Sequence, residues 1–303
     1  NPSFWRYAGN AGFRTIYLDA QRQDGKLQNF MDERELAEIG VEQADTSSRP
    51  DAKDVEAPRL LNRMLLRERP SFIYVNKMGC HFPYEGKYPA ANTLYSPTMA
   101  RTYFSSEVDP DDSGFELAQN AEQRWRQVNS YRNCVAWNTR AFFREALADV
   151  RLEDTLIFYT ADHGQNFHED GSPGLQTHCT TGPASATEGR VPLAAITRHP
   201  ELSPVLREAA RRNHDRASHF NVYPTLLSMM GYAPPAAHDD FEPDLLADLA
   251  DNRRAFLSTY FVRFGREPVW NSIGKPEQLR DGLQQVLADE RRHAGGVGTS
   301  GSP

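Results

Sequence analysis

Apolar residues along the chain follow two patterns, short continuous runs and longer stretches in which they recur every three or four residues. Runs of the first kind occupy residues 15–18, 72–75, 155–160, 191–197 and 256–264. Continuous runs of this length, rich in β-branched and aromatic residues, are typical of strands that are buried on both faces. The sequence therefore predicts a strand at each run, with 155–160 as a central parallel strand.

Between these runs the apolar positions recur with the period of a helix. The spacing predicts helices at 31–39, 55–68, 115–150, 204–212, 218–230 and 276–292, after a first helix that ends near residue 10. One apolar stripe follows the longest helix and consists of Ala121, Trp125, Val128, Tyr131, Val135, Phe142 and Ala146. The segment 42–53 is polar and turn-rich, and 79–114 is a long loop of the kind that usually serves a function.

Strands that alternate with helices indicate an α/β fold. We expect a doubly wound, mostly parallel sheet with helices on both faces, in which ligands bind beyond the carboxyl ends of the strands. Residues 1–293 are predicted to form a single domain. The Gly/Ser-rich tail at 294–303 is predicted to be disordered.

Composition narrows the possible functions. The chain has 303 residues, of which 25% are charged, and a formal net charge of -7. An acidic chain is a poor candidate for binding nucleic acid. No apolar run approaches the length of a membrane span, and no signal peptide is present, so we expect the chain as given to be soluble.

The three cysteines do not form a dense disulfide scaffold or a CxxC metal motif. Cys80 and Cys179 each stand beside a histidine, so they either bridge in space or act as small buried fillers, and we favour fillers. Cys134 lies on the long predicted helix and is expected to contribute packing alone. Counting cysteines therefore does not identify the redox compartment.

Two of the predicted strands end at residues suited to metal or phosphoryl chemistry. The strand at 155–160 is followed by Asp162, His163 and Gly164, and His178 lies fifteen residues beyond His163. The strand at 72–75 is followed by His81. A carboxylate and an imidazole on one tight turn can bind a single divalent ion, and zinc accepts this mixed ligand set. We expect these four side chains to converge on one pocket at one edge of the sheet.

Plainer interpretations remain open at each position. An Asp-His pair is often only a surface turn, and His81 is either an ordinary loop histidine or a group that holds a phosphate or sulfate oxygen or acts as a general acid. Lys87 would add positive charge, although an exposed lysine is normally just solvated. His168, Glu169 and Asp170 are interpreted as a solvated acidic turn. His219, at the start of a predicted helix, is a weaker candidate.

Several sequence blocks together resemble the alkaline phosphatase/sulfatase superfamily, and most of all the catalytic domain of bacterial phosphoethanolamine transferases that modify lipid A and related glycolipids. The blocks in chain order are 11–15 with 18–21, 77–84 with 87–89, 129–133, 162–164 with His178, 191–192, 218–219 and 224–227. The resemblance spans about residues 4–232. It rests on the combination, because no single block is specific.

The resemblance implies a zinc-dependent enzyme in which a threonine attacks a phospholipid donor and passes phosphoethanolamine to an envelope glycolipid or sugar acceptor. By matching position, Asp162 and His163 would be zinc ligands. His81 and His178 would hold the phosphoryl group or a second metal. The resemblance also implies a place at the periplasmic face of the inner membrane, with membrane contact through an N-terminal region that precedes this chain in the family.

The chain departs from the family pattern in ways that affect catalysis. The nucleophilic threonine and the first acidic zinc ligand of the family precede the block that residues 4–18 match, so we expect this chain alone to be inactive. Gln165 and Arg132 stand where the family usually has Glu and Asp. The alternatives are a sulfatase or phosphoglycerol transferase of the same superfamily, or an inactive remnant that binds a metal or an anion. Any activity would require another nucleophile, such as Thr180 or Thr181.

Overall fold

Strands and helices alternate along the chain in the computed structural model. It describes residues 3–21, 31–44, 50–67, 69–101, 121–168, 178, 184–233, 242–250, 255–257, 265 and 267–274. The elements are α1 (Phe4–Asn10), β1 (Arg14–Asp19), α2 (Glu33–Leu36), β2 (Val41–Ala44), α3 (Pro50–Leu65), β3 (Ser71–Asn76), the 3-10 turns η1 (Glu85–Lys87) and η2 (Ala90–Asn92), α5 (Ala121–Ala146), β4 (Ile157–Thr160), α6 (Ala186–Gly189), β5 (Leu193–Ile196), α7 (Leu202–Arg212), α8 (His219–Met229), β6 (Ala255–Leu257) and β7 (Trp270–Ser272). The predicted α/β class is confirmed.

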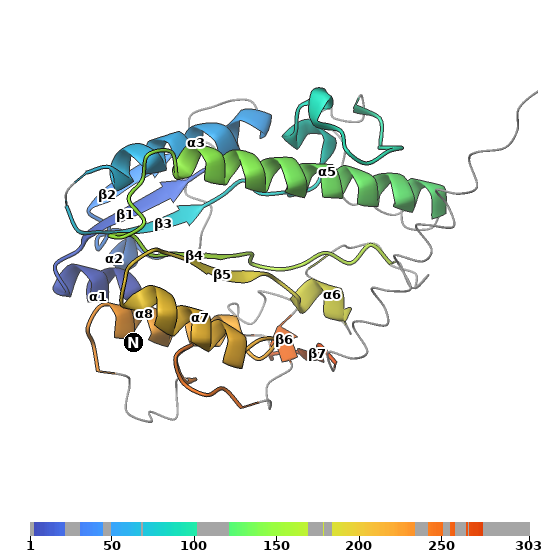
Figure 1. Ribbon diagram of the computed structural model, residues 1–303. Helices are drawn as coiled ribbons and strands as arrows, with labels where there is room; N and C mark the ends of the chain where they lie inside the picture. Colours follow the sequence, from blue (N-terminus) through green and yellow to red (C-terminus); the bar gives the residue numbers. More distant parts are fainter. Residues whose placement is uncertain are drawn as a thin grey trace, which may run out of the picture.

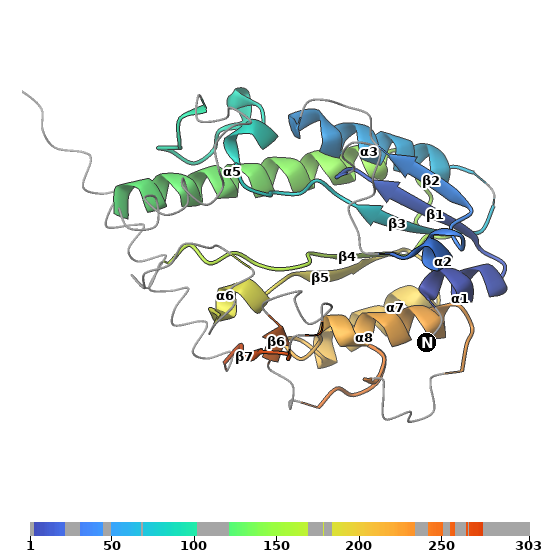
Figure 2. The ribbon, with the colours of Figure 1, turned by 180° about the vertical axis from the view of Figure 1, so that it is seen from behind.

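The first sheet is parallel and has the strand order β2-β1-β3. Helices α3 and α5 lie on one side of it, and α1, α7 and α8 lie on the other side of the layer of strands (Figures 1 and 2). Neighbouring side chains of β1 point to opposite faces of the sheet, because side chains alternate along a strand. Leu18 packs with Leu61 of α3 and Phe142 of α5, while the ring of Tyr17 meets Trp5 of α1 edge-on at 6.0 Å. Helices therefore cover both faces of this sheet.

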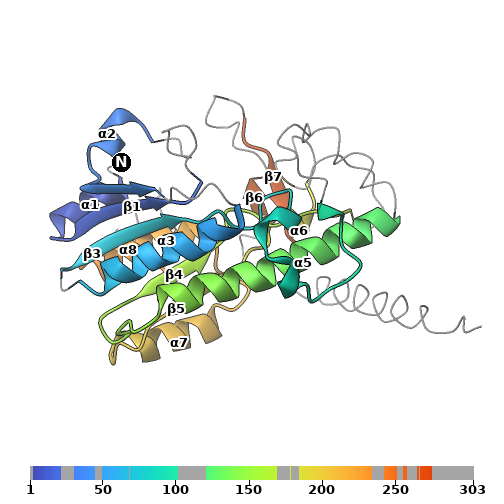
Figure 3. The same cartoon turned by 90° about the horizontal axis from the view of Figure 1, so that it is seen from above.

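Strands β4 and β5 form a separate antiparallel pair, with Ile157 opposite Ile196. The prediction of 155–160 as a central parallel strand is wrong in this respect. Figure 3 shows β4 and β5 side by side between α5 and α7. Phe143 of α5 packs on Tyr159 of β4 at 5.2 Å. The residues of this pair are almost all apolar, and that pattern carries no information on strand direction.

Some predicted elements differ from the structure or lie outside the described residues. Strand β2 falls where the sequence predicted a polar segment, because its backbone pairs with the buried strand β1, an interaction that side-chain polarity does not reveal. The short strand β7, paired with β6, was also not predicted. The predicted helix at 276–292 and the tail at 294–303 lie outside the described residues. Within the described part of the chain, no helix combines the length and the apolar character needed to cross a bilayer.

Helix α5 also holds an extended segment that follows η2. Asn133 is fully buried, and its Oδ1 accepts hydrogen bonds from the backbone N–H groups of Leu94 (2.7 Å) and Tyr95 (2.8 Å). Its Nδ2 donates to the carbonyl oxygen of Tyr95 at 2.9 Å. One turn earlier, Ser130 Oγ accepts from the N–H of Met99 at 3.0 Å. Part of the 129–133 block therefore has a structural role.

Replacing Asn133 should destabilise the fold. Asn133→Ala removes a fully buried side chain together with its hydrogen bonds to the backbone of Leu94 and Tyr95, which should lower the free energy of unfolding by about 2 to 4 kcal/mol. Urea denaturation followed by circular dichroism measures this change. Asn92→Ala, at an exposed position of η2, is the matched control and should change stability by less than about 0.5 kcal/mol. Equal effects of the two substitutions would contradict this account of the helix.

Candidate active site

Three histidine rings come together beyond the carboxyl ends of β3 and β4. The rings of His163 and His178 are stacked, with centroids 4.1 Å apart and planes 8° from parallel. His81 meets His178 edge-on, with a centroid distance of 6.1 Å. Asp162 adjoins this group, and its Oδ2 lies 3.6 Å from His163 Nε2. The structure thus brings together the four side chains that the sequence singled out, although it does not test their roles.

The turn that carries His163 is held by a close backbone contact. The N–H of Gly164 donates to the carbonyl oxygen of Glu188 at 2.7 Å, and a Cβ atom on Gly164 would lie 2.0 Å from the carbonyl oxygen of Thr187. Only glycine fits there. His163 Nδ1 lies 2.8 Å from the carbonyl oxygen of Gly164, which can only accept. Nδ1 therefore carries the proton in the neutral ring, and Nε2 keeps the lone pair that a metal requires.

The environment of His178 favours its neutral form. Burial, with smaller contributions from the neighbouring rings of His163 and His81, lowers the pKa of His178 to about 4, against the opposing effect of Asp162. Desolvation and like charges both disfavour an imidazolium ion. His178 is therefore neutral at pH 7 in this arrangement.

The loop that carries His81 is anchored from within. Lys87 Nζ donates hydrogen bonds to the carbonyl oxygens of His81 (2.6 Å) and Pro83 (3.2 Å). The structure thereby corrects the prediction of an exposed, solvated Lys87, because this side chain is buried and its burial lowers the pKa to about 8. The Nδ1 of His81 lies 2.6 Å from the carbonyl oxygen of Phe82, so Nε2 is the acceptor nitrogen of the neutral ring. Lys87 thus supports the backbone beneath His81.

A disulfide joins Cys80 to Cys134, with a Cα–Cα distance of 5.9 Å. The prediction that Cys134 contributes packing alone is wrong, and so is the filler role favoured for Cys80. Two thiols beside histidines suggested a pair, but the partner of Cys80 is set by the approach of the loop to α5, which spacing along the chain does not show. Cys179 lies outside the described residues.

The disulfide is part of an apolar cluster that joins two loops. Its buried members are Tyr84, Tyr88, Cys134 and Phe167. Tyr84 follows His81 along the chain, and Phe167 belongs to the segment that begins at Asp162. Both loops that carry site residues therefore pack on the same part of α5.

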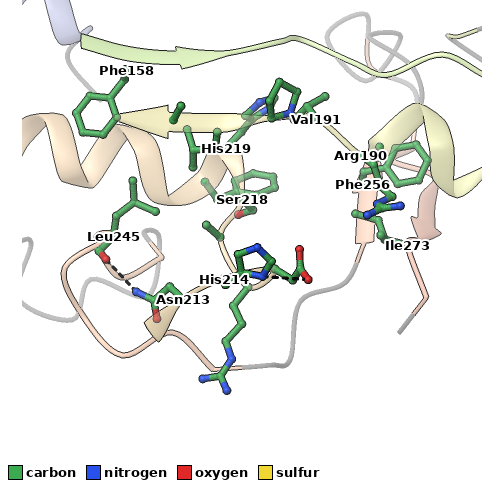
Figure 4. A pocket seen from close by; sticks show the side chains of 18 of the residues that line it. Phe158, Arg190, Val191, Asn213, His214, Ser218, His219, Leu245, Phe256 and Ile273 are labelled. Carbon is green, nitrogen blue, oxygen red and sulfur yellow. Dashed lines mark hydrogen bonds and ion pairs between the residues drawn. The ribbon is translucent and has the colours of Figure 1, made fainter. Parts of the chain in front are cut away.

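A cavity of about 620 Å³ adjoins Asp162 and His163. Figure 4 shows its lining, in which apolar side chains such as Phe158 and Leu245 face the polar residues His214, Ser218 and His219. His219 Nε2 lies 3.0 Å from the hydroxyl oxygen of Thr160, at the end of β4. The weaker sequence candidate His219 thus lines the same cavity as Asp162 and His163.

The described residues supply part of a metal site. No group of three or more His, Cys, Asp or Glu residues suited to a metal ion occurs among them. Two donors bound to one tetrahedral zinc ion at 2.0–2.1 Å are about 3.4 Å apart. Asp162 Oδ2 and His163 Nε2, at 3.6 Å, fit two neighbouring corners of such a site. The donor pair is compatible with zinc.

Other sequence candidates do not enter the site or lie outside the described residues. His168 is buried, with φ at 55°, so its prediction as part of a solvated turn is wrong. Glu169, Asp170, Thr180 and Thr181 lie outside the described residues. The sequence analysis missed Lys87 as a buried group, since a single lysine in a loop carries no signal of burial.

Glu85, in η1 after the His81 loop, should make the stability of the protein depend on pH. Burial raises the pKa of this carboxyl group, against the lowering effects of Ser130 and Arg101, and its Oε1 has no hydrogen-bond partner among the described residues. A carboxyl group with a raised folded pKa binds protons more tightly in the folded protein. Stability is therefore lost as the pH rises above the ordinary value of 4.5 and through the folded pKa.

Glu85→Gln should remove this dependence. We expect the variant to be more stable than the wild type at pH 7, with about 1.4 kcal/mol for each pH unit by which the pKa is raised, and the advantage to vanish below pH 4.5. Chemical denaturation at pH 4, 5.5 and 7 measures it. An advantage that does not change with pH would show that the carboxyl group is not the cause.

Comparisons with known proteins match most of the chain to one family. The family model described as Sulfatase matches residues 1–232. The chain is 26% identical over 211 residues to the Kdo(2)-lipid A phosphoethanolamine 7''-transferase of Salmonella typhimurium, a match that covers 64% of this chain and 33% of the relative. The chain thus spans about a third of the length of this curated relative.

Two solved structures share the fold. The C-terminal periplasmic domain of EcEptC from Escherichia coli, in complex with Zn, superposes with a TM-score of 0.56 at 15% identity, covering 84% of this chain and 67% of that domain. The integral membrane protein lipooligosaccharide phosphoethanolamine transferase A from Neisseria meningitidis gives a TM-score of 0.52 at 14% identity, over 74% of this chain and 40% of that protein. At these identities the likeness bears on the fold alone.

Proposed function

This chain belongs to the sulfatase family, and from that premise we propose that it is the histidine-bearing part of a metal-dependent phosphoethanolamine transferase. The donor would be a phospholipid, and the acceptor an envelope glycolipid or sugar. The observation that carries this proposal is the approach of His81, His163 and His178 to one another beside Asp162. Similarity to a lipid A phosphoethanolamine transferase supports the choice of the transferred group.

Each residue has a distinct role in the proposal. Asp162 and His163 would hold a zinc ion, which when bound supplies a Lewis acid for a phosphoryl oxygen. His163 presents Nε2 because its Nδ1 is bound to the carbonyl oxygen of Gly164. His81, whose side chain is exposed, and His178 would hold the remaining phosphoryl oxygens. The backbone contact at Gly164 keeps the metal-binding pair in place during the reaction.

Location follows from the same reasoning. Disulfides persist in oxidising compartments such as the periplasm and are rare in the cytosol. The bond between Cys80 and Cys134 therefore supports a periplasmic site of action. The fold likeness to a periplasmic domain, and to a transferase that is an integral membrane protein, is consistent with a place at the periplasmic face of the inner membrane.

Two alternatives differ from this proposal in the donor that they would use or in the absence of turnover. A sulfatase or phosphoglycerol transferase of the same family would use the same histidines with another donor. A metal- or anion-binding remnant would bind without turnover, and an Asp162–His163 pair without a nucleophile suits it too. The similarity to a phosphoethanolamine transferase favours the proposed transferase over both alternatives.

Metal analysis tests the ligand assignment. Purified protein should hold about one zinc ion per chain, and weakly, because the described donors fill only part of a zinc site. His163→Ala should lower the content at least tenfold, as plasma mass spectrometry after dialysis would measure. His199→Gln, which changes a histidine at the start of α7, is the control and should keep the wild-type content. Equal, near-zero contents in the wild type and His163→Ala would overturn the assignment.

Turnover by this chain alone tests whether it carries its own nucleophile. We expect no hydrolysis of bis(p-nitrophenyl) phosphate by the zinc-loaded chain above the level of free zinc, because no family nucleophile stands at the matching position. Release of p-nitrophenolate, followed by absorbance, is the measurement. Robust hydrolysis that is lost in a Thr180→Ala or Thr181→Ala variant would instead assign the nucleophile to this chain.

A further inference from the structure

The disulfide lies directly beside a residue of the proposed site. Cys80 immediately precedes His81, and Cys134 is a fully buried residue of α5. The two cysteines are 54 residues apart in sequence, so the bond fixes the loop to a distant helix rather than closing a local turn. This position gives the bond a direct influence on where His81 lies.

Non-covalent contacts hold the loop on both sides of the disulfide. Before the disulfide, the carboxylate of Asp54 accepts hydrogen bonds from the N–H groups of Met78 (3.1 Å) and Gly79 (2.8 Å). Gly79 has φ at 61°, a conformation that glycine adopts without strain. Beyond the disulfide, support comes from Lys87, whose ammonium group ends a flexible four-carbon chain, and from the buried ring of Tyr84.

The side chain of His81 adds little to its own placement. It is exposed, and its contact with His178 is an edge-on approach at 6.1 Å rather than a packed interface. Cys80, in contrast, packs with Tyr84 and Cys134 in the apolar cluster on α5. The covalent link is therefore the strongest restraint on the backbone at His81 among the contacts of the described loop.

We propose that the Cys80–Cys134 disulfide is a positioning element that holds His81 in reach of His178, so that the histidine group assembles only in the oxidised protein. The role of His81 in holding a phosphoryl group rests on the proposed function. The dependence of its position on the disulfide does not, because that dependence follows from the contacts of the loop.

The redox step is a thiol–disulfide exchange. Forming the bond removes two electrons and two protons from the Cys80 and Cys134 thiols, and the disulfide of a dithiol oxidant takes them up as two thiols. In the reverse reaction a reductant attacks Sγ of Cys80, the half-buried cysteine, and Cys134 leaves as the thiolate and is then protonated. The apolar surroundings of Cys134 favour that protonation.

Histidine NMR on the full chain tests the proposal without zinc or substrate. The His81 ring signal, assigned through His81→Gln, should change when the wild type is reduced with TCEP and in the double variant Cys80→Ser/Cys134→Ser. The signals of His199 and His214 should stay in place. Cys179→Ser, which removes the third thiol, is the matched control and should keep the oxidised His81 signal. Mass spectrometry of alkylated peptides establishes the redox state of each sample.

Hydrogen exchange covers the case in which the double variant does not fold. In the reduced wild type, the amides of 79–84 should exchange on the order of tenfold faster, while those of β1 and α3 keep their protection. Faster exchange throughout the chain would make the bond a general stabiliser and overturn the positioning role. So would a His81 signal that is unchanged after complete reduction, or free thiols at Cys80 and Cys134 in the oxidised protein. None of these outcomes bears on zinc content, which tests the proposed function separately.

Discussion

Contact among three aromatic rings fixes the distance between the two loops that carry the histidines. Tyr84, Tyr131 and Phe167 come from the His81 loop, from α5 and from the segment after Asp162. Their ring centroids lie 5.2 Å (Tyr84–Tyr131), 5.1 Å (Tyr131–Phe167) and 6.0 Å (Tyr84–Phe167) apart. Tyr84 and Phe167 are buried, so moving either loop would expose large apolar surfaces to water. The ends of β3 and β4 bring the loops near, and this contact holds them together alongside the Cys80–Cys134 disulfide.

The same packing sets the charges around the site. Burial raises the pKa of Tyr131, and the charges of Tyr159 and Asp162 raise it further. Burial likewise raises the pKa of Tyr74 in β3, again with a contribution from Asp162. These phenols therefore stay protonated, and His178 stays neutral at pH 7. With its neighbours uncharged, the carboxylate of Asp162 is the negative charge that a cation would meet beside His163, which suits a metal-binding pair.

The sequence predicted the positions of the candidate site residues better than it predicted the contacts that hold those residues in place. Asp162, His163 and His81 follow apolar runs, and ligands of an α/β fold bind beyond the carboxyl ends of its strands, so their approach could be foreseen. The direction of β5 relative to β4 could not be foreseen, because an apolar run looks the same whether its partner strand is parallel or antiparallel. The partner of Cys80 and the burial of Lys87 depend on contacts between distant segments, which local patterns do not encode.

The contacts of helix α5 show why the sequence did not predict how the site is held. Its apolar stripe correctly indicated a buried helix, but its polar residues also make specific contacts, with neighbouring loops. Asn133 holds the segment at 94–95, and Cys134, its neighbour, holds the His81 loop. Arg132 has its guanidinium group 5.6 Å from the ring centre of Tyr95, so the residue that departs from the family pattern packs on that same segment. The helix is thus a common support for the His81 loop, the segment at 94–95 and the segment after Asp162, through the disulfide, Asn133 and the ring of Tyr131.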